Sequence, residues 1–494
     1  MKVLSILSFA AGLLLTYAGY LFFDYNQPII KNIYLLAGFT CLSLIPMIVD
    51  SAREFFGRTR LLKPARWSGI LFILAAVLLV YAFLQSALLD YFQPFSLYDD
   101  VIYLTLAAFL LLIIRLVING VMAFLEKDLG VSAFVMAGIS VFFLLGFWGW
   151  NVMQGDFDFH NVDPEPAHVF ERGEDGYDIF RIPSLVVIPA GSNLADGSVV
   201  ERDLVLALAE GRRKGSLDDG EIDLVLKRSL DAGVNWSNLE IVREWEGGQG
   251  KIGNPTPVFD QDSGVLFLFH IAGASRPYTT WVMESIDGGL SYSEPYELGD
   301  SIVGPGHGIQ VFEGKFRGRL MVPAHSDQSS RVWYSDDQGQ SWILSLPVGV
   351  GNESEVAETG DGNQLMAVRT NHSVAKPHGD LHQLFSRSDD GGETWSAAVE
   401  NEDLKTPICM ASLVSQDGQL YFSYPDDYHS RALMTVARSR DGGVNFDEKM
   451  LIYPGPAGYS DLAVLSNGDL LLLFENGSVE YDERLTLVRI PENW

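Results

Sequence analysis

The chain has 494 residues, and 48% of them are hydrophobic, so it has room for more than one domain. The chain has 34 Lys+Arg and 63 Asp+Glu residues, of which residues 1–150 contain 9 basic and 8 acidic ones. Residues 151–494 therefore contain 25 basic and 55 acidic residues, a net charge of −30. This excess argues against binding to nucleic acid or to an anionic lipid surface. Two cysteines, Cys41 and Cys409, imply no disulfide framework. The sequence has no metalloprotease, P-loop or dinucleotide motif, so we predict no metal and no cofactor.

Residues 1–153 consist mainly of apolar runs close to the ~20 residues that a helix needs to cross a bilayer. We predict a membrane anchor of about five transmembrane helices, at residues 3–23, 30–49, 68–88, 101–123 and 131–152. Arg115 lies in the fourth run, where its side chain can reach the cytoplasmic interface. A cleaved signal peptide over residues 1–20 is an alternative for the first run.

The loops between these runs predict the topology. Residues 51–67 carry five basic side chains, whereas residues 89–100 carry three Asp and no Lys or Arg. Because basic loops stay in the cytoplasm, we expect a cytoplasmic N-terminus and an extracytoplasmic chain after Met153. Residues 154–169 are acidic and contain two prolines, and we interpret them as a linker.

A repeated motif organises the remaining residues, 170–494. The pattern S-x-D-x-G-x-[STN]-aromatic begins at positions 229, 285, 335, 388 and 439, with spacings of 56, 50, 53 and 51 residues. A period of roughly 50 residues with strand-like flanks predicts a β-propeller. Because terminal blades are often irregular, five boxes are compatible with an all-β, six-bladed β-propeller.

Each residue of the box suits a turn. An Asp side chain can accept hydrogen bonds from backbone N–H groups ahead of it, and the Gly two positions later can adopt φ > 0. Five copies are too many for one active centre. The boxes therefore predict hairpin turns rather than catalytic residues or calcium ligands.

Three segments before the first box carry charged residues beside apolar runs. Arg181 lies in the run Y-D-I-F-R-I-P-S, and Arg212 ends the run L-A-L-A-E-G-R. A polar loop with Asp218 and Asp219 then leads into I-D-L-V-L-K-R and the first box. Together with the five boxes, these segments resemble the exo-sialidases (neuraminidases) of the six-bladed propeller type. The resemblance covers residues 165–490 and does not extend to the membrane region.

Further segments fit the same family. Residues 253–258 and 304–310 resemble its second-blade segment and its glycine-rich loop. The family has a glutamate followed sixteen residues later by an arginine, which matches Glu353 and Arg369, with Glu355 and Glu358 as competing choices for the glutamate.

The resemblance implies a role for each matched residue. Three arginines would clamp the carboxylate of a sialic acid, since a guanidinium binds a carboxylate through two parallel hydrogen bonds: Arg181, Arg369 and Arg431. Tyr459 would be the nucleophile, because a neutral phenol avoids the repulsion that a carboxylate would meet. Glu353 would act as its base and Asp218 as the acid and base at the leaving oxygen, with Asp219 as the alternative. Arg212 would line the substrate site.

The expected function is that of a membrane-anchored exo-α-sialidase outside the cytoplasm, which hydrolyses terminal sialic acids from glycoconjugates with retention of configuration. A propeller that binds sialoglycans without catalysis is an alternative. A trans-sialidase, or a hydrolase of a related nonulosonic acid, is another.

Overall fold

A computed structural model describes residues 158–494, except 163–164, 247–249, 275–276, 300, 327–328, 371–380, 429 and 493. The described residues belong to one compact unit, Asp156–Trp494. The five predicted spans and Arg115 lie outside the described residues. Within the described part of the chain, no helix has the length and apolar character of a membrane span.

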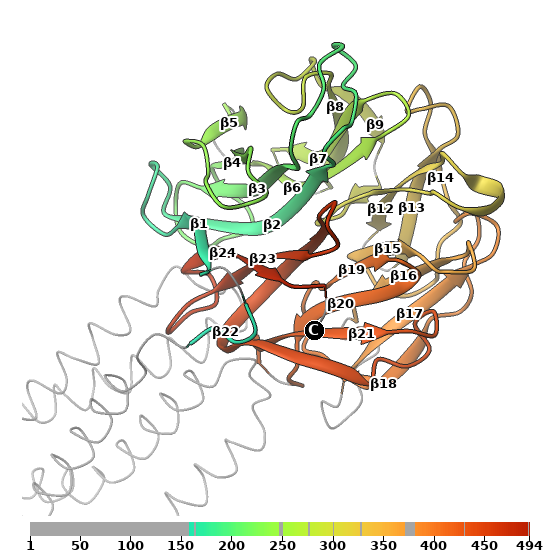
Figure 1. Cartoon of the computed structure of the whole chain (residues 1–494). Coiled ribbons are helices and arrows are strands. Elements are labelled where there is room, and N and C mark those ends of the chain that lie inside the picture. Colours follow the sequence, from blue (N-terminus) through green and yellow to red (C-terminus); the bar gives the residue numbers. More distant parts are fainter. Residues whose placement is uncertain are drawn as a thin grey trace, which may run out of the picture. The chain divides into compact units, whose positions relative to one another are not determined.

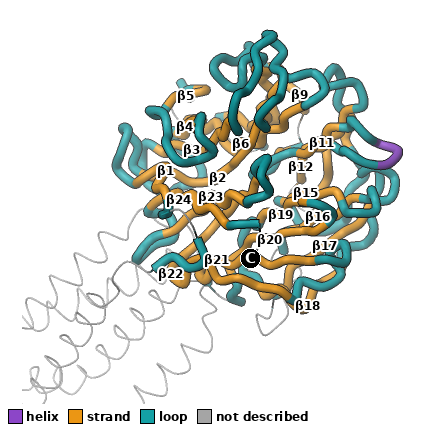
Figure 2. The backbone as a smooth tube through the Cα atoms, viewed as in Figure 1, coloured by secondary structure: helices purple, strands orange, loops and turns teal. Residues whose placement is uncertain are grey.

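The described chain is all-β, with one short 3₁₀ turn, η1 (Gly314–Phe316), among strands and loops (Figure 2). The first and largest sheet has eight strands (Figure 1). They are β2 (Ile179–Ile188), β3 (Leu204–Arg212), β4 (Ile222–Ser229), β5 (Glu240–Arg243), β6 (Lys251–Asp260), β7 (Val265–Gly273), β8 (Thr279–Ser285) and β9 (Tyr296–Gly299).

Two smaller sheets follow in the chain. The five-stranded sheet consists of β10 (Ile302–Val303), β11 (Ile309–Gln310), β12 (Leu320–Ser326), β13 (Ser329–Ser335) and β14 (Ile343–Leu344). The four-stranded sheet consists of β15 (Ser354–Glu358), β16 (Gln364–Val368), β17 (His382–Ser388) and β18 (Val399–Lys405).

The last sheet has seven strands and joins the two ends of the described chain. It consists of β19 (Ser412–Gln416), β20 (Gln419–Pro425), β21 (Ala432–Ser439), β22 (Glu448–Val464), β23 (Leu470–Asn476), β24 (Arg484–Ile490) and β1 (Ala167–Glu171). Strand β1 pairs with β24, with Ala167 opposite Leu487 (Figure 1). Because β1 begins at Ala167, it starts within the stretch predicted as a linker. This pairing covers a sheet edge that would otherwise be open.

Apolar strands surround the centre of the fold. β3 is buried along its whole length, and so is β23, whose sequence is L-L-L-L-F-E-N. Short apolar runs of this kind are typical of strands buried on both faces. Inner strands contact one another in a closed cycle, from β2 through β6, β12, β15, β19 and β22 back to β2. This cycle brings residues distant in sequence to one central region.

The five boxes form turns, as predicted. They follow β4, β8, β13, β17 and β21, and in each one the box Ser hydroxyl donates to the box Asp at 2.8 Å. In the fourth box, Gly392 N donates to Ser388 Oγ at 2.8 Å and Thr394 N donates to Asp390 at 2.9 Å. The Asp carboxylates are thus occupied in holding their own turns.

Candidate active site

Tyr459 and Glu353 meet at the centre of the fold. Tyr459 lies in β22, and Glu353 directly precedes β15. The phenolic O–H of Tyr459 lies 2.9 and 2.8 Å from the two carboxylate oxygens of Glu353. Arg369, directly after β16, donates to the phenolic oxygen at 2.6 Å and also pairs with Glu353. Tyr459 is only 6% exposed, so this contact is largely shielded from water.

The electrostatics of this pair suit proton transfer from the phenol to the carboxylate. Burial raises the pKa of Tyr459 well above its ordinary value, although the charge of Arg369 opposes the rise. Burial also raises the pKa of Glu353, but Arg369, His325 and the hydrogen bonds outweigh it, so that this pKa is below its ordinary value. These directions make Glu353 an ionised acceptor and Tyr459 a protonated donor.

Three arginines surround the Tyr459 ring. The guanidinium carbons of Arg181 in β2, Arg369 and Arg431 lie 5.5, 5.7 and 5.2 Å from its centroid. Arg431 directly precedes β21. A second ring, that of Tyr481, lies 5.3 Å from Arg181 and 4.9 Å from Arg431. Three permanent positive charges thus come together from β2, from the end of β16 and from the start of β21.

The three arginines differ in their protein partners. Arg181 donates to both oxygens of Glu475 in β23, at 2.9 and 3.2 Å, and the same carboxylate accepts the backbone N–H of Tyr459 at 3.0 Å. Arg369 pairs with Glu353. Arg431 donates to the carbonyl oxygen of Ile408 at 3.2 Å, and no carboxylate of the described residues lies within ion-pair distance of it.

Asp218 lies in the loop between β3 and β4, and 59% of its side chain is exposed. Its carboxylate is 3.0 Å from Arg212 and 3.6 Å from Arg181. Partial desolvation raises its pKa, but Arg212, Arg181 and Lys251 outweigh that effect and hold the pKa well below its ordinary value. Asp219, the alternative, instead accepts a hydrogen bond from the hydroxyl of Tyr278.

The competing glutamates lie elsewhere. Glu358 accepts the backbone N–H groups of Phe312 and Glu313, at 2.9 and 2.8 Å. Glu355 is completely buried and contacts His307 rather than Tyr459. Of the three glutamates weighed from the sequence, the structure brings Glu353 alone to the phenol.

Sequence reasoning assigned no role to Glu475 or Glu210. Glu475 holds Arg181, and Glu210 binds Arg212 at 2.6 Å and Lys251 at 3.3 Å. Both carboxylates are 0% exposed. A signal was present, since each is a charged residue within an otherwise apolar strand, and such charges are rarely buried without a partner.

One group of metal-type ligands exists among the described residues. Atoms of His307, Glu355 and Asp461 lie within 4.8 Å of one another. Asp461 already accepts hydrogen bonds from Ser412 Oγ at 2.9 Å and from Leu185 N at 2.6 Å. His307 Nδ1 lies 2.8 Å from Asp461 Oδ1, the separation of a hydrogen bond. These contacts make the three residues a hydrogen-bonded cluster of ionisable groups.

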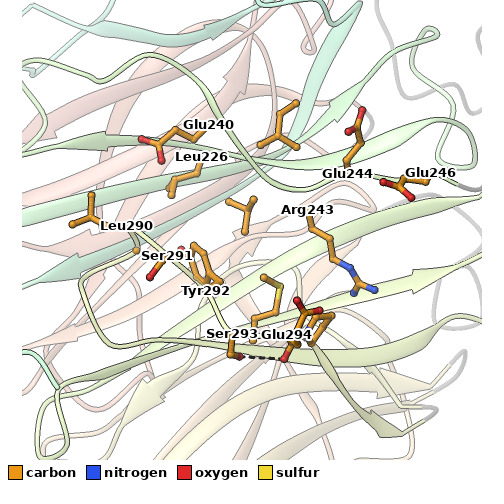
Figure 3. A pocket seen from close by; sticks show the side chains of 15 residues that line it. Leu226, Glu240, Arg243, Glu244, Glu246, Leu290, Ser291, Tyr292, Ser293 and Glu294 are labelled. Carbon is orange, nitrogen blue, oxygen red and sulfur yellow. Dashed lines mark hydrogen bonds between the residues drawn. The ribbon is translucent and has the colours of Figure 1, made fainter. Parts of the chain in front are cut away.

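A separate cavity of about 640 Å³ lies beside β5 and the second box (Figure 3). Four glutamates and Arg243 line it, and none of the predicted site residues does. It is distinct from the cluster around Tyr459.

Comparison with known proteins adds a family match and several relatives. Residues 204–472 match the BNR repeat-like domain family. A sialidase of Micromonospora viridifaciens is 28% identical over an alignment of 350 residues, gaps included, that covers 62% of this chain and 51% of that protein. Sialidase-3 of Rattus norvegicus is 24% identical over an alignment of 405 residues, gaps included, that covers 64% of this chain and 92% of that one. The chain thus spans about half the length of the Micromonospora protein.

Solved structures share the fold. A Hadza microbial sialidase superposes with a TM-score of 0.56 at 23% identity, over 66% of this chain and 68% of that one. The intramolecular trans-sialidase from Ruminococcus gnavus gives 0.53 at 18% identity, over 66% and 97%. At these identities the likeness shows that the all-β fold matches the sialidase propellers.

Proposed function

The chain belongs to the exo-sialidase family of glycoside hydrolases with Asp-box repeats, and from this premise we propose that it is an exo-α-sialidase that releases terminal sialic acids from glycoconjugates. One observation carries the proposal: three arginines from distant segments of the chain surround Tyr459, whose hydroxyl donates to the carboxylate of Glu353.

The arginines would bind the carboxylate on the anomeric carbon of a sialic acid. Arg181 and Arg369 are oriented by buried or partly buried glutamates, and Arg431 lacks such a partner among the described residues. A substrate carboxylate would supply the missing negative charge. The net negative charge of the domain repels anions at long range. Salt screens this repulsion over about 8–10 Å under physiological conditions, so that close to the arginines their attraction outweighs it.

Catalysis would proceed in two displacements. In the first, Tyr459 Oη attacks the anomeric carbon, its proton passes to Glu353, and Asp218 donates a proton to the departing glycosidic oxygen. In the second, Asp218 takes a proton from water as the water oxygen attacks the same carbon, and Tyr459 leaves and regains its proton from Glu353. Each step inverts the anomeric carbon, so configuration is retained.

Substrate binding would also prepare Asp218 for its first task. Three cations hold its pKa low in the free protein. When a substrate carboxylate pairs with Arg181, part of that positive charge is neutralised, and the pKa of Asp218 rises toward a value at which it carries a proton.

We further propose six blades and an extracytoplasmic position. Strand pairing supports six groups, because β22 pairs with β21 through residues 448–456 and with β23 through residues 457–464, and so contributes to two groups. The loop charges of residues 1–153 support a membrane anchor with its N-terminus inside. Labelling of single cysteines introduced into the box turns, with a reagent that does not cross membranes, tests the location.

Turnover by the full-length protein tests the function. We expect release of the fluorescent alcohol from its α-sialoside and of lactose from sialyllactose, with α-sialic acid as the first product by NMR. Tyr459→Phe and Arg181→Ala should lose activity severely. Tyr177→Phe is the matched control, because that buried hydroxyl bonds Asp223 instead.

Other results would point to the alternatives. Sialic acid binding without turnover by folded protein would indicate a binding propeller. Transfer of sialic acid to added lactose, and not to water, would indicate a transferase.

A further inference from the structure

A second charged layer lies next to the Tyr459–Glu353 pair, on the same two chain segments. Glu355 and Asp461 follow Glu353 and Tyr459 by two positions in these segments. His307 joins the two carboxylates of this second layer. Its Nδ1 lies 2.8 Å from Asp461 and 3.6 Å from Glu355, and its backbone N–H donates to Glu355 at 3.0 Å.

This cluster ties together the strands that carry the catalytic candidates. Asp461 in β22 accepts the backbone N–H of Leu185 in β2 at 2.6 Å and the hydroxyl of Ser412 in β19 at 2.9 Å. Glu355 belongs to β15. The loop of His307 approaches so closely that a Cβ on Gly306, at φ +112°, would lie 1.5 Å from a Glu355 oxygen. The cluster therefore leaves little freedom for β15 and β22 to move apart.

The titratable groups of the cluster are buried close together. Glu355 and Asp461 are each 0% exposed, and His307 is 8% exposed. Among the described residues, the titratable groups that face His307 are Glu355 from β15 and Asp461 from β22, while β2 and β19 offer Leu185 N and a serine hydroxyl to Asp461. Two buried carboxylates so close repel each other, and burial together with Asp461 raises the pKa of Glu355 well above its ordinary value, while His307 opposes that rise.

His307 is reached from the side away from Tyr459. It lines a cavity of about 660 Å³ together with residues 185–187, 357–360 and 462–464. These residues lie toward the ends of β2, β15 and β22. Arg181 lies near the start of β2, Glu353 directly precedes β15, and Tyr459 comes before residues 462–464 in β22. A substitution at His307 therefore need not touch the substrate.

We propose that His307 is a positioning residue for the proposed hydrolysis, since it holds Glu355 and Asp461 together and thereby sets the separation of Glu353 and Tyr459. The inference rests on the proposed function. Its removal lowers kcat more than it raises KM, because two of the three arginines take their orientation from other groups, Arg181 from Glu475 and Arg431 from the Ile408 carbonyl.

Kinetics of the full-length protein test the proposal. His307→Ala should lower kcat by about 10²-fold, the cost of a misplacement near 1 Å, with a smaller change in KM. His307→Asn keeps an N–H donor near the Nδ1 position and should recover part of kcat. His270→Asn is the matched control, because His270 is also buried but pairs with Arg243. It should lower Tm and leave kcat per folded molecule unchanged.

The outcomes separate positioning from general stability. Equal losses in His307→Ala and His270→Asn, in proportion to the folded fraction, would overturn the proposal, as would an unchanged kcat in His307→Ala. If His307→Ala does not fold, His307→Asn carries the same comparison.

A crystal structure of the variant tests the geometry independently of the reaction. The separations of 2.8 and 2.9 Å between Tyr459 Oη and the Glu353 oxygens should lengthen in the variant. Unchanged separations would contradict the inference. Absence of turnover by the wild type would instead contradict the proposed function, and the structural comparison would still decide the role of His307.

Discussion

The phenolic oxygen of Tyr459 lies 2.8 Å from a carboxylate oxygen of Glu353, although 106 residues separate them in the chain. If the two act as one nucleophile, their substitutions cannot be additive. Tyr459→Phe should reduce kcat by about 10⁴-fold or more, and Glu353→Gln should cost little further in the double variant. Kinetic measurement of all four proteins gives this coupling, and additive losses would show that the residues act independently.

Arg431 should contribute mainly to substrate binding. Lysine keeps the charge but loses the planar fork, so Arg431→Lys should raise KM by about 10- to 100-fold, the equivalent of one charged hydrogen bond, with a smaller change in kcat. Arg228→Lys is the control, because Arg228 pairs with Glu240 at 2.8 Å on an outer strand. Equal KM values in the two variants would remove Arg431 from the binding site.

Asp218→Asn should discriminate between leaving groups. A sugar leaving group needs a proton, so hydrolysis of sialyllactose should fall by about 10²- to 10⁴-fold, while an aryl sialoside with an acidic leaving group should be hydrolysed at close to the wild-type rate. The pKa of Asp218 is held below its ordinary value, so the wild-type kcat/KM for sialyllactose should rise as pH falls from 7. Equal losses for both substrates would rule out the acid role.

The pH dependence of stability should reveal the charge on His307. Burial lowers its pKa, but Glu355 and Asp461 outweigh burial and raise the pKa to about 9. Its stabilisation is therefore complete below the unfolded pKa, about 6.5, and is lost as pH rises through about 9. The difference in Tm between the wild type and His307→Asn should shrink over that interval. A constant difference would contradict the raised pKa of His307.

The box turns should matter for stability alone. Asp390 accepts hydrogen bonds from Thr394 N at 2.9 Å and from Ser388 Oγ at 2.8 Å, so Asp390→Ala should lower the free energy of unfolding by about 1–2 kcal/mol. Its exposed neighbour Asp389 makes no side-chain hydrogen bond within the described chain, and Asp389→Ala is the control. Thermal unfolding should give a lower Tm for Asp390→Ala, and kinetics should give an unchanged kcat. Loss of turnover per folded molecule would argue against a purely structural role for the box.

The features that could be predicted from the amino-acid sequence are the local ones. A box requires residues only a few positions apart, so its turn and its spacing could be identified in the sequence. Both predicted the all-β fold. Arg181, Arg369, Arg431 and Tyr459 could be matched because each lies in a short segment of recognisable pattern. The order of these segments along the chain and the residue types that they carry are therefore properties of the sequence alone.

Which charged side chains pair with one another depends on the tertiary structure. Glu353, Glu355 and Glu358 are near-equivalent in the chain, but the direction of each side chain at β15 sends one to Tyr459, one to His307 and one to the N–H groups of Phe312 and Glu313. Closure of the inner strands brings Glu475 to Arg181 from 294 residues away. No local pattern encodes such pairs, because the electrostatic need to neutralise a buried charge is met by whichever strand the fold places opposite it.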